Sequence, residues 1–356
     1  MIILSNQISR TLHLGLLLGA SLVLCAQNVD DDKRLQWWDD IDGFYNQQHK
    51  VTLKLVDEAL SAYPPDLEEP LERKMAMLML DGVLHEEAAP ERPAVQDFLK
   101  RRVAAAIHEI SISKVEKGAM IWKLYNHGFV VRTPSVTMGF DLVPGNPWME
   151  GDFRVDQAVF RKLADACDVL FISHLHGDHA NQWLAETFID HGKPVIAPPE
   201  IWDGLPIHER ILHLPREAHT RQKILLPHDV QLSVVVYPGH QGADIQNNVV
   251  LVTSPEGISV AHTGDQSGPE DEWAWMDKIG DFHRTDILLP NCWTPDILRM
   301  IRGVAPALVI TGHENEMGHT VDHRESNWLT YTRLKGAASP YILMTWGESY
   351  HYEPEP

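Results

Sequence analysis

The chain contains 356 residues, of which 44% are hydrophobic and 22% charged, as in a globular protein that buries a full apolar core. This length allows one large domain or two of moderate size. The formal net charge of −20 at pH 7 argues against a nucleic-acid partner, because binding to a phosphate backbone depends on clustered Lys and Arg.

The first residues have the pattern of an export signal. Arg10 precedes a charge-free apolar stretch, residues 14–24, which is too short to span a bilayer but long enough for the hydrophobic region of a signal peptide. We therefore predict a signal peptide over residues 1–26, cleaved after Ala26, and a periplasmic or extracellular location. Two alternatives stay open: lipidation at Cys25, the one route by which we expect contact with a membrane, and an N-terminal core helix.

Residues 27–117 are predicted to form a helical N-terminal extension. Apolar residues recur at spacings near 3.6 within residues 51–60, 67–80 and 95–107, and prolines separate these stretches. We interpret the extension as a packed cap or stabilising layer, and a lid or partner-binding module is the alternative.

The pattern changes near Ala119, where short apolar and β-branched stretches alternate with turns and helices. Short helices are expected after the fourth strand and near Asp296–Arg302, and a turn at Pro255–Gly257 predicts a hairpin. Residues 118–356 are therefore predicted to form one α/β domain. The expected strands are Met120–Tyr125, Phe129–Val131, Thr137–Leu142, Val169–Ile172, Pro194–Ala197, Leu232–Tyr237, Asn248–Thr253, Ile258–His262, Asp286–Leu289, Leu308–Ile310 and Tyr341–Trp346.

The two cysteines beyond the signal, Cys167 and Cys292, do not form the regular pattern of a disulfide framework. Both lie beside apolar stretches. We predict two buried free thiols, with a single disulfide as the alternative in an oxidising compartment.

The segment after the strand Val169–Ile172 concentrates metal-ligand chemistry. It contains His174, His176, Asp178 and His179, and burying so many polar side chains without partners would be costly. Ligands at a strand end and in the turn that follows can converge on one point. Because apolar residues then recur at helical spacing, we expect Asp178 and His179 to lie around the N-terminus of a helix.

Three later strand ends each supply one more candidate ligand: His240, Asp265 and His313. Each follows a glycine, which lets the backbone turn sharply and approach a metal closely. Together with the first segment, four strand ends can bring seven ligands into one cleft.

This ordered set resembles the signature of the metallo-beta-lactamase fold superfamily, HxHxDH followed by separate His, Asp and His ligands. The resemblance covers roughly residues 119–350 and implies a four-layer αββα sandwich and a metal-dependent hydrolase. By this resemblance two divalent ions are bound. His174, His176 and His240 would hold the first, Asp178, His179 and His313 would hold the second, and Asp265 would bridge them.

The resemblance also implies the chemistry. Two ions can activate a bridging water as hydroxide and stabilise the charge that develops during its attack, and Asp178 would orient the nucleophile or accept its proton as the catalytic residue. The ligand types suit zinc, while manganese and iron are alternatives.

Two short elements loosely resemble the branch that contains L-ascorbate-6-phosphate lactonase and N-acyl phosphatidylethanolamine phospholipase D. They are His127 in Asn-His-Gly and Asp141 in Phe-Asp-Leu, although Pro is absent after Asp141. His127 is interpreted either as a proton donor or substrate contact, or as a structural hydrogen-bonding residue.

Glu314, Glu316 and His319 follow the last ligand closely. Such density beside a metal ligand indicates residues that orient the imidazoles or contact substrate, and a solvated loop is the alternative.

These observations predict an exported hydrolase that cleaves a small ester, lactone or phosphodiester. One alternative is an iron-dependent oxidoreductase of the same fold, and another is a non-catalytic metal-binding protein. A nuclease is disfavoured by the acidic charge and by the short interval between Asp265 and His313. The expected partner is a small-molecule substrate, and the sequence specifies neither the bond cleaved nor an oligomeric state.

Overall fold

The structure is a computed structural model that describes residues 40–145 and 153–354. The predicted signal peptide and Cys25 lie outside the described residues. The chain divides into two compact units, residues 1–48 and 49–356, and the second contains all the candidate ligands. Within the described part of the chain, no helix is both long and apolar enough to cross a bilayer.

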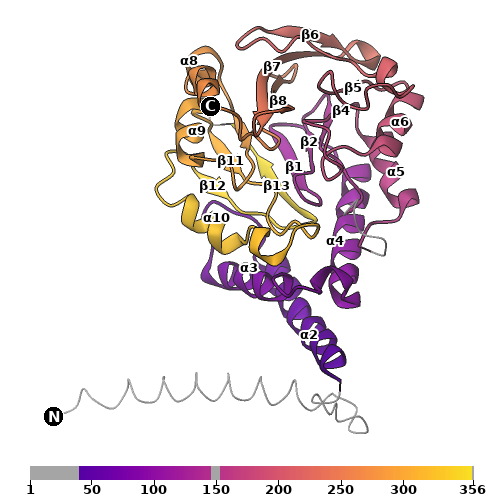
Figure 1. Ribbon diagram of the computed structural model, residues 1–356, viewed down its shortest axis with the longest axis vertical. Helices are drawn as coiled ribbons and strands as arrows, with labels where there is room; N and C mark the ends of the chain where they lie inside the picture. Colours follow the sequence, from indigo (N-terminus) through magenta and orange to yellow (C-terminus); the bar gives the residue numbers. More distant parts are fainter. Residues whose placement is uncertain (1–39, 146–152, 355–356) are drawn as a thin grey trace, which may run out of the picture. The chain divides into compact units, whose positions relative to one another are not determined.

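Two mixed sheets form the centre of the second unit, as far as the described residues show (Figure 1). The first sheet has the order β13-β1-β2-β3-β4-β5, and its strands are β1 (Ala119–Lys123), β2 (Phe129–Arg132), β3 (Thr137–Phe140), β4 (Val169–Phe171), β5 (Val195–Ile196) and β13 (Glu348–Tyr352). The second has the order β12-β11-β10-β9-β8-β7-β6, and its strands are β6 (Gln222–Leu225), β7 (Gln231–Gln241), β8 (Ile245–Thr253), β9 (Ser259–His262), β10 (Ile287–Leu289), β11 (Leu308–Ile310) and β12 (Tyr341–Ile342).

An apolar core separates the two sheets. It contains side chains from both, such as Phe129 and Val131 of β2 and Ile287 and Leu289 of β10. Leu288, between the last two, belongs instead to the core under the helices. This alternation with period two places one face of each sheet against the other sheet and the opposite face against helices.

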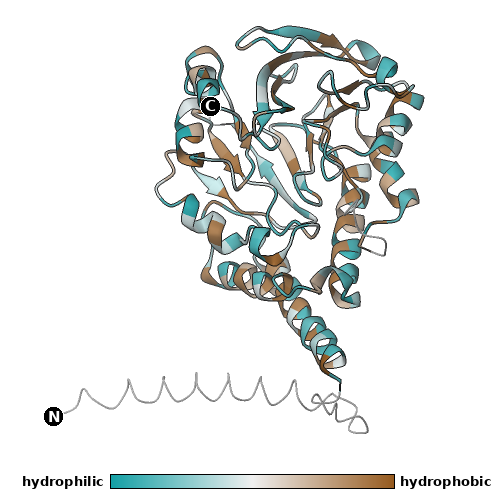
Figure 2. Cartoon of the chain, viewed as in Figure 1, coloured by the Kyte–Doolittle hydropathy of each residue, from teal (hydrophilic) through white to brown (hydrophobic). Residues whose placement is uncertain are grey.

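Helices cover both outer faces, which makes the four-layer αββα arrangement predicted from the sequence. α4 (Pro93–Ile112), α5 (Gln157–Ala166) and α6 (Gln182–Asp190) lie along the first sheet, and α7 (Trp273–Met276), α8 (Ile279–Phe282) and α9 (Ile297–Val304) cover the second. Hydrophobic and hydrophilic residues alternate along these helices (Figure 2), as expected of amphipathic helices with one buried face.

The predicted N-terminal helices are present as α2 (Ile41–Ala62), α3 (Leu71–Leu84) and α4. α3 and α4 bury apolar side chains in the helix-facing core, among them Leu80 and Phe98. α3 also contacts α10 (Asn327–Arg333), and the fully buried Arg73 of α3 pairs with Glu348 of β13 at 2.7 Å. α3 and α4 therefore form a packed layer of the fold within the second unit.

Several sequence predictions of elements need correction. β6 lies where a loop was expected, and the C-terminal strand is Glu348–Tyr352, with only Tyr341–Ile342 of the expected 341–346 in a strand. α6 begins at Gln182 because the Asn181 side chain caps it by accepting from Leu184 N, so Asp178 and His179 lie in the preceding turn.

β7 also differs from its prediction, because it continues through Pro238 to Gln241 instead of ending at Tyr237. β6 pairs with β7 only from Gln231 to Val234. Among the described residues, β7 pairs at Pro238 with β8 alone, which is consistent with a residue that lacks an N–H at this position.

Candidate metal centre

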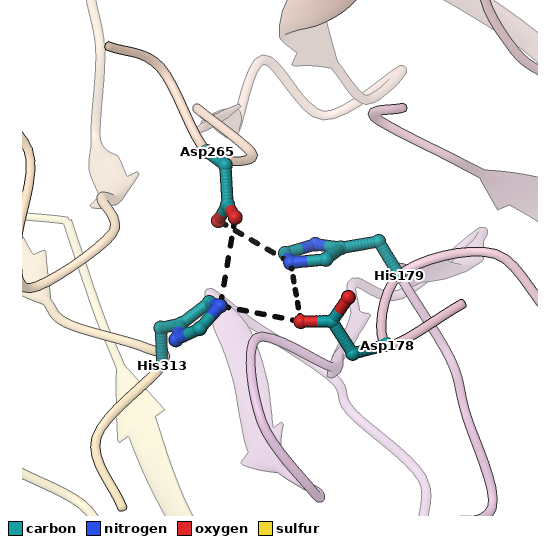
Figure 3. A group of neighbouring side chains, drawn as sticks. All are labelled: Asp178, His179, Asp265 and His313. Carbon is teal, nitrogen blue, oxygen red and sulfur yellow. Dashed lines mark ion pairs between the residues drawn. The ribbon is translucent and has the colours of Figure 1, made fainter. Parts of the chain in front are cut away.

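The predicted ligands come from four segments at one edge of the two sheets. Asp178 and His179 follow β4, His240 is the last residue but one of β7, Asp265 follows β9, and His313 follows β11. β9, β10 and β11 are parallel, so the chain leaves them at the same edge. Figure 3 shows all of these side chains except His240 pointing toward one another.

Nitrogen and oxygen atoms alternate around the centre of this cluster. His179 Nε2 lies 3.3 Å from both Asp178 Oδ2 and Asp265 Oδ1. His313 Nε2 lies 3.4 Å from Asp178 Oδ2 and 3.5 Å from Asp265 Oδ2. All four residues are buried, and their ligand atoms lie within 4.8 Å of one another, as a metal site requires.

Three imidazole nitrogens at this place have no hydrogen-bond partner among the described residues: Nε2 of His174, His179 and His313. Each is buried, and an unsatisfied buried polar atom normally costs free energy. His174 Nε2 lies 3.8 Å from Asp265 Oδ2, so it faces the same carboxylate as the other two. A metal ion would satisfy all three nitrogens, and the residues present therefore fit such an ion.

His176 and His240 stand at the margin of the cluster and are more exposed. The ring of His176 lies 4.8 Å from that of His174, measured between centroids. His240 is linked to the cluster through Gln241, whose Nε2 donates to Asp265 Oδ2 at 3.1 Å. The structure thus groups Asp178, His179, Asp265 and His313 tightly, whereas the three histidines predicted for the first ion surround this group more loosely.

Asp141 supports the cluster through a hydrogen bond to the His179 imidazole. His179 Nδ1 donates to Asp141 Oδ2 at 2.7 Å, and the backbone and hydroxyl of Ser173 donate to the same carboxylate at 2.7 and 2.6 Å. The carboxylate keeps the proton of His179 on Nδ1, which leaves Nε2 as the ligand atom. Asp141 is fully buried, and this hydrogen bond to His179 is of the kind that orients a ligating imidazole.

Glu272 has the same role for His240, and sequence reasoning missed it. Its Oε1 lies 2.5 Å from His240 Nδ1, and Gln266 Nε2 donates to its other oxygen at 2.5 Å. Glu272 stands in an acidic run, Glu270–Glu272, and no sequence signal distinguishes it from its neighbours. The two exposed members of the run could equally have been chosen.

Side-chain amides donate hydrogen bonds to the carboxylates of Asp178 and Asp265, and sequence reasoning missed the asparagines that carry them. Asn126 Nδ2 donates to Asp178 Oδ2 at 2.9 Å, and Asn291 Nδ2 donates to Asp265 Oδ1. Asn126 precedes His127 in the element noted above, but an isolated Asn carries no signal of its own.

The glycines that precede His240, Asp265 and His313 make room for neighbouring side chains. A Cβ on Gly239 would lie 1.9 Å from Gln266 Oε1, and one on Gly312 would lie 2.2 Å from His127 Cδ2. Only Gly264 has a positive φ, of 51°. The expected sharp turn therefore applies to Gly264, whereas the other two glycines permit close approach.

The charges of the cluster depend on one another. Burial lowers the pKa of His174 to about 3, whereas Asp265 and Asp178 overcome burial and raise the pKa of His313 to about 10. Burial raises the pKa of Asp265, but His179 and His313 outweigh it and hold this pKa well below its usual range. Protons on imidazoles thus balance the buried carboxylates, and a cation could take their place.

The remaining candidates occupy different positions. His127 is fully buried, and its Nε2 donates to the carbonyl of Leu289 at 3.3 Å, a contact of the kind that the structural alternative describes. Glu314 forms a buried ion pair with Lys123. Glu316 accepts from Tyr125 Oη at 2.8 Å.

His319 is half-buried, and its ring lies 5.7 Å from that of His313 between centroids. Of the three candidate residues after His313, it is the only one that is not buried. The predicted free thiols Cys167 and Cys292 are both buried and unpaired in a disulfide, as predicted.

No family model matches the sequence, and no curated protein matches it either. Solved structures do match. The metallo hydrolase Igni18 from Ignicoccus hospitalis KIN4/I has a TM-score of 0.51 and 18% identity, and the match covers 67% of this chain and 99% of Igni18.

Two weaker matches have TM-scores below 0.5. The metallo-beta-lactamase fold protein YhfI from Bacillus subtilis has a TM-score of 0.44 and 12% identity, covering 66% of this chain and 100% of YhfI. CmlA, a diiron beta-hydroxylase from Streptomyces venezuelae, has a TM-score of 0.47 and 14% identity, covering 67% of this chain and 55% of CmlA. Together with the two sheets packed between helices, the match to Igni18 shows that the chain shares the fold of this metallo hydrolase.

Proposed function

We propose that this chain is a metal-dependent hydrolase with two divalent ions at the centre formed by its strand ends. His174, His176 and His240 would hold the first ion, Asp178, His179 and His313 the second, and Asp265 would contact both. The observation that carries the proposal is the set of three buried Nε2 atoms without hydrogen-bond partners, facing the carboxylates of Asp178 and Asp265. A chain that used these residues only for packing would leave those nitrogens without a hydrogen bond, with only longer ion pairs to the two carboxylates.

Metal ions bound here would lower the pKa of a water molecule and polarise the bond to be cleaved. The protein's own contribution is orientation. Asn126 holds Asp178 Oδ2, and Asp141 and Glu272 hold the Nδ1 protons of His179 and His240. Asp178 is the residue that we assign to orient the nucleophile or accept its proton.

The substrate class that we propose is a small ester, lactone or phosphodiester, and the ions are zinc, with manganese or iron as alternatives. Export to the periplasm or the cell exterior is part of the proposal and is supported by the apolar stretch over residues 14–24. The second candidate function is an iron-dependent oxidoreductase, because a His-rich and carboxylate-containing site also suits iron.

The test combines metal analysis with hydrolysis. The mature chain should contain about two ions per molecule, and it should hydrolyse at least one of three generic substrates, a lactone, an aryl ester or bis-p-nitrophenyl phosphate. Asp178→Ala should abolish this hydrolysis, whereas Asp322→Ala, at a side chain with 79% exposure, should not change it.

Metal content well below one ion per chain, or an Asp178→Ala variant as active as the Asp322→Ala control, would overturn the proposal. Tightly bound iron, with oxygen-dependent turnover and no hydrolysis, would favour the oxidoreductase instead. Among the three substrates, activity on the phosphodiester alone would assign a phosphodiesterase.

A further inference from the structure

A buried carboxylate on the helical layer reaches the loop that carries His313. Asp81 of α3 is 8% exposed. Its Oδ1 accepts from Asn315 Nδ2 at 3.2 Å and from Asn327 N and Nδ2 at 2.9 and 2.8 Å. Its Oδ2 accepts from Trp328 N at 2.9 Å. Four donors on one carboxylate offset part of the cost of burying its charge, although burial still raises the pKa of Asp81 above its usual value.

One of these donors belongs to a strained stretch of backbone. Asn315 lies two residues after His313, and both have left-handed backbone conformations, with φ of 55° and 75°. Non-glycine residues adopt this conformation only where the surroundings hold them in it. Asn315 is held twice, by Asp81 through its side chain and by the carbonyl of Glu325 through its backbone N–H at 2.8 Å.

The other donors lie at the far end of the same loop. Asn327 and Trp328 are the first residues of α10, and their backbone N–H groups have no partner within that helix. A negative charge there also interacts favourably with the positive end of the helix. Asp81 therefore joins both ends of the 313–328 loop to α3. This helix belongs to the N-terminal helical layer, which is far from the candidate ligands in the sequence.

We propose that Asp81 is a positioning residue for the second metal ion, and that the helical layer is thereby a structural part of the metal centre. This inference rests on the proposed function, because it assumes that His313 binds an ion. Asp81 touches neither ligand atoms nor substrate. It acts by holding the backbone of the His313 loop in the conformation that points Nε2 at Asp178 and Asp265.

The experiment measures metal affinity in three variants of the full chain, by titration with Zn²⁺ against a chelating indicator, alongside thermal unfolding. Asp81→Ala removes all four contacts. Asn315→Gly removes only the contact between Asp81 and Asn315, at the end of the loop that carries His313, while glycine keeps the left-handed backbone. Arg73→Lys is the matched control, because Arg73 lies on the same helix but contacts Glu348 and the carbonyl of Leu343 rather than the loop.

Asp81→Ala should weaken binding of one of the two ions about tenfold or more and leave the other within about twofold. Asn315→Gly should weaken the same ion in the same direction, and it carries the test if Asp81→Ala does not fold. Arg73→Lys should lower the melting temperature without changing either affinity. A residue with only a structural role would change the melting temperature alone.

Wild-type affinity for both ions in the Asn315→Gly and Asp81→Ala variants would overturn the inference. So would an equal loss of affinity in Arg73→Lys, because the effect would then follow general destabilisation. A wild-type chain that binds no metal would overturn the proposed function itself, so the two failures are distinguishable.

Discussion

Oε1 of Glu272 lies 2.5 Å from Nδ1 of His240, which leaves Nε2 as the nitrogen that can coordinate an ion. A carboxylate behind a ligating imidazole fixes its tautomer and raises its basicity. Glu272→Ala should therefore weaken binding of the first ion by about 10–100-fold. Glu272→Gln, which keeps a hydrogen-bond acceptor but loses the charge, should fall between wild type and Glu272→Ala.

Metal titration of these two variants checks the prediction, with Glu270→Ala as the control. Glu270 lies in the same short helix, but its side chain is 84% exposed and pairs with Arg299. If Glu272→Ala bound both ions as tightly as Glu270→Ala does, Glu272 would have no part in orienting His240.

The buried ion pair between Lys123 and Glu314 predicts strong coupling between the two side chains, which are 1% and 3% exposed. Lys123→Met should lower the free energy of unfolding by about 3–5 kcal/mol, because it leaves the Glu314 charge buried without its partner. The double variant Lys123→Met with Glu314→Gln should recover much of this loss, since neither charge remains. Urea denaturation measures both, and simply additive effects would show that the pair is not coupled.

Replacement by alanine should have opposite effects on stability at Gly312 and at Gly82. Gly312→Ala should destabilise the chain by about 1–3 kcal/mol, because the new Cβ would lie 2.2 Å from His127 Cδ2. Gly82, on the exposed side of α3, has no atom within 4 Å of the same added Cβ. Gly82→Ala should therefore stabilise by about 0.5–1 kcal/mol through helix propensity. Thermal and urea unfolding should rank the three proteins in the order Gly82→Ala, wild type, Gly312→Ala, and any other order would refute the steric argument.

Burial predicts that both thiols are unreactive in the folded chain. It raises the pKa of Cys167 to about 12 and that of Cys292 well above its ordinary value. A thiol in an unfolded chain has a pKa of about 8.5, and the thiolate is the reactive form. A protein that begins at residue 27 and so lacks Cys25 should therefore show no labelling by a thiol reagent at pH 9 and two labelled thiols in denaturant.

The same pKa shifts have a consequence for stability. Above about pH 8.5 the unfolded chain releases thiol protons that the folded chain keeps, so the free energy of unfolding should decrease as the pH rises further. Rapid labelling of the native chain at pH 9 would contradict the burial of these side chains.

Local sequence patterns predicted the parts of the fold that local forces decide. The apolar periodicity located α3 and α4, and the Pro-Glu-Gly turn located the hairpin of β8 and β9, because helix and turn formation depend on neighbouring residues. β6, which has polar residues on both faces, was missed, and β7 was expected to end at Tyr237 although it continues through Pro238 to Gln241.

The sequence by itself determined which residues are candidate ligands and in what order they occur, because His and Asp after strand ends are readable from residue type and spacing. Only the tertiary structure decided which of their neighbours support them. Glu272 and Asp141 reach imidazoles 32 and 38 residues away along the chain, and Asp81 reaches Asn315 across 234 residues. Such contacts depend on how the sheets and helices pack, and a carboxylate in a helix has the same local sequence signal whether it faces solvent or a ligand loop.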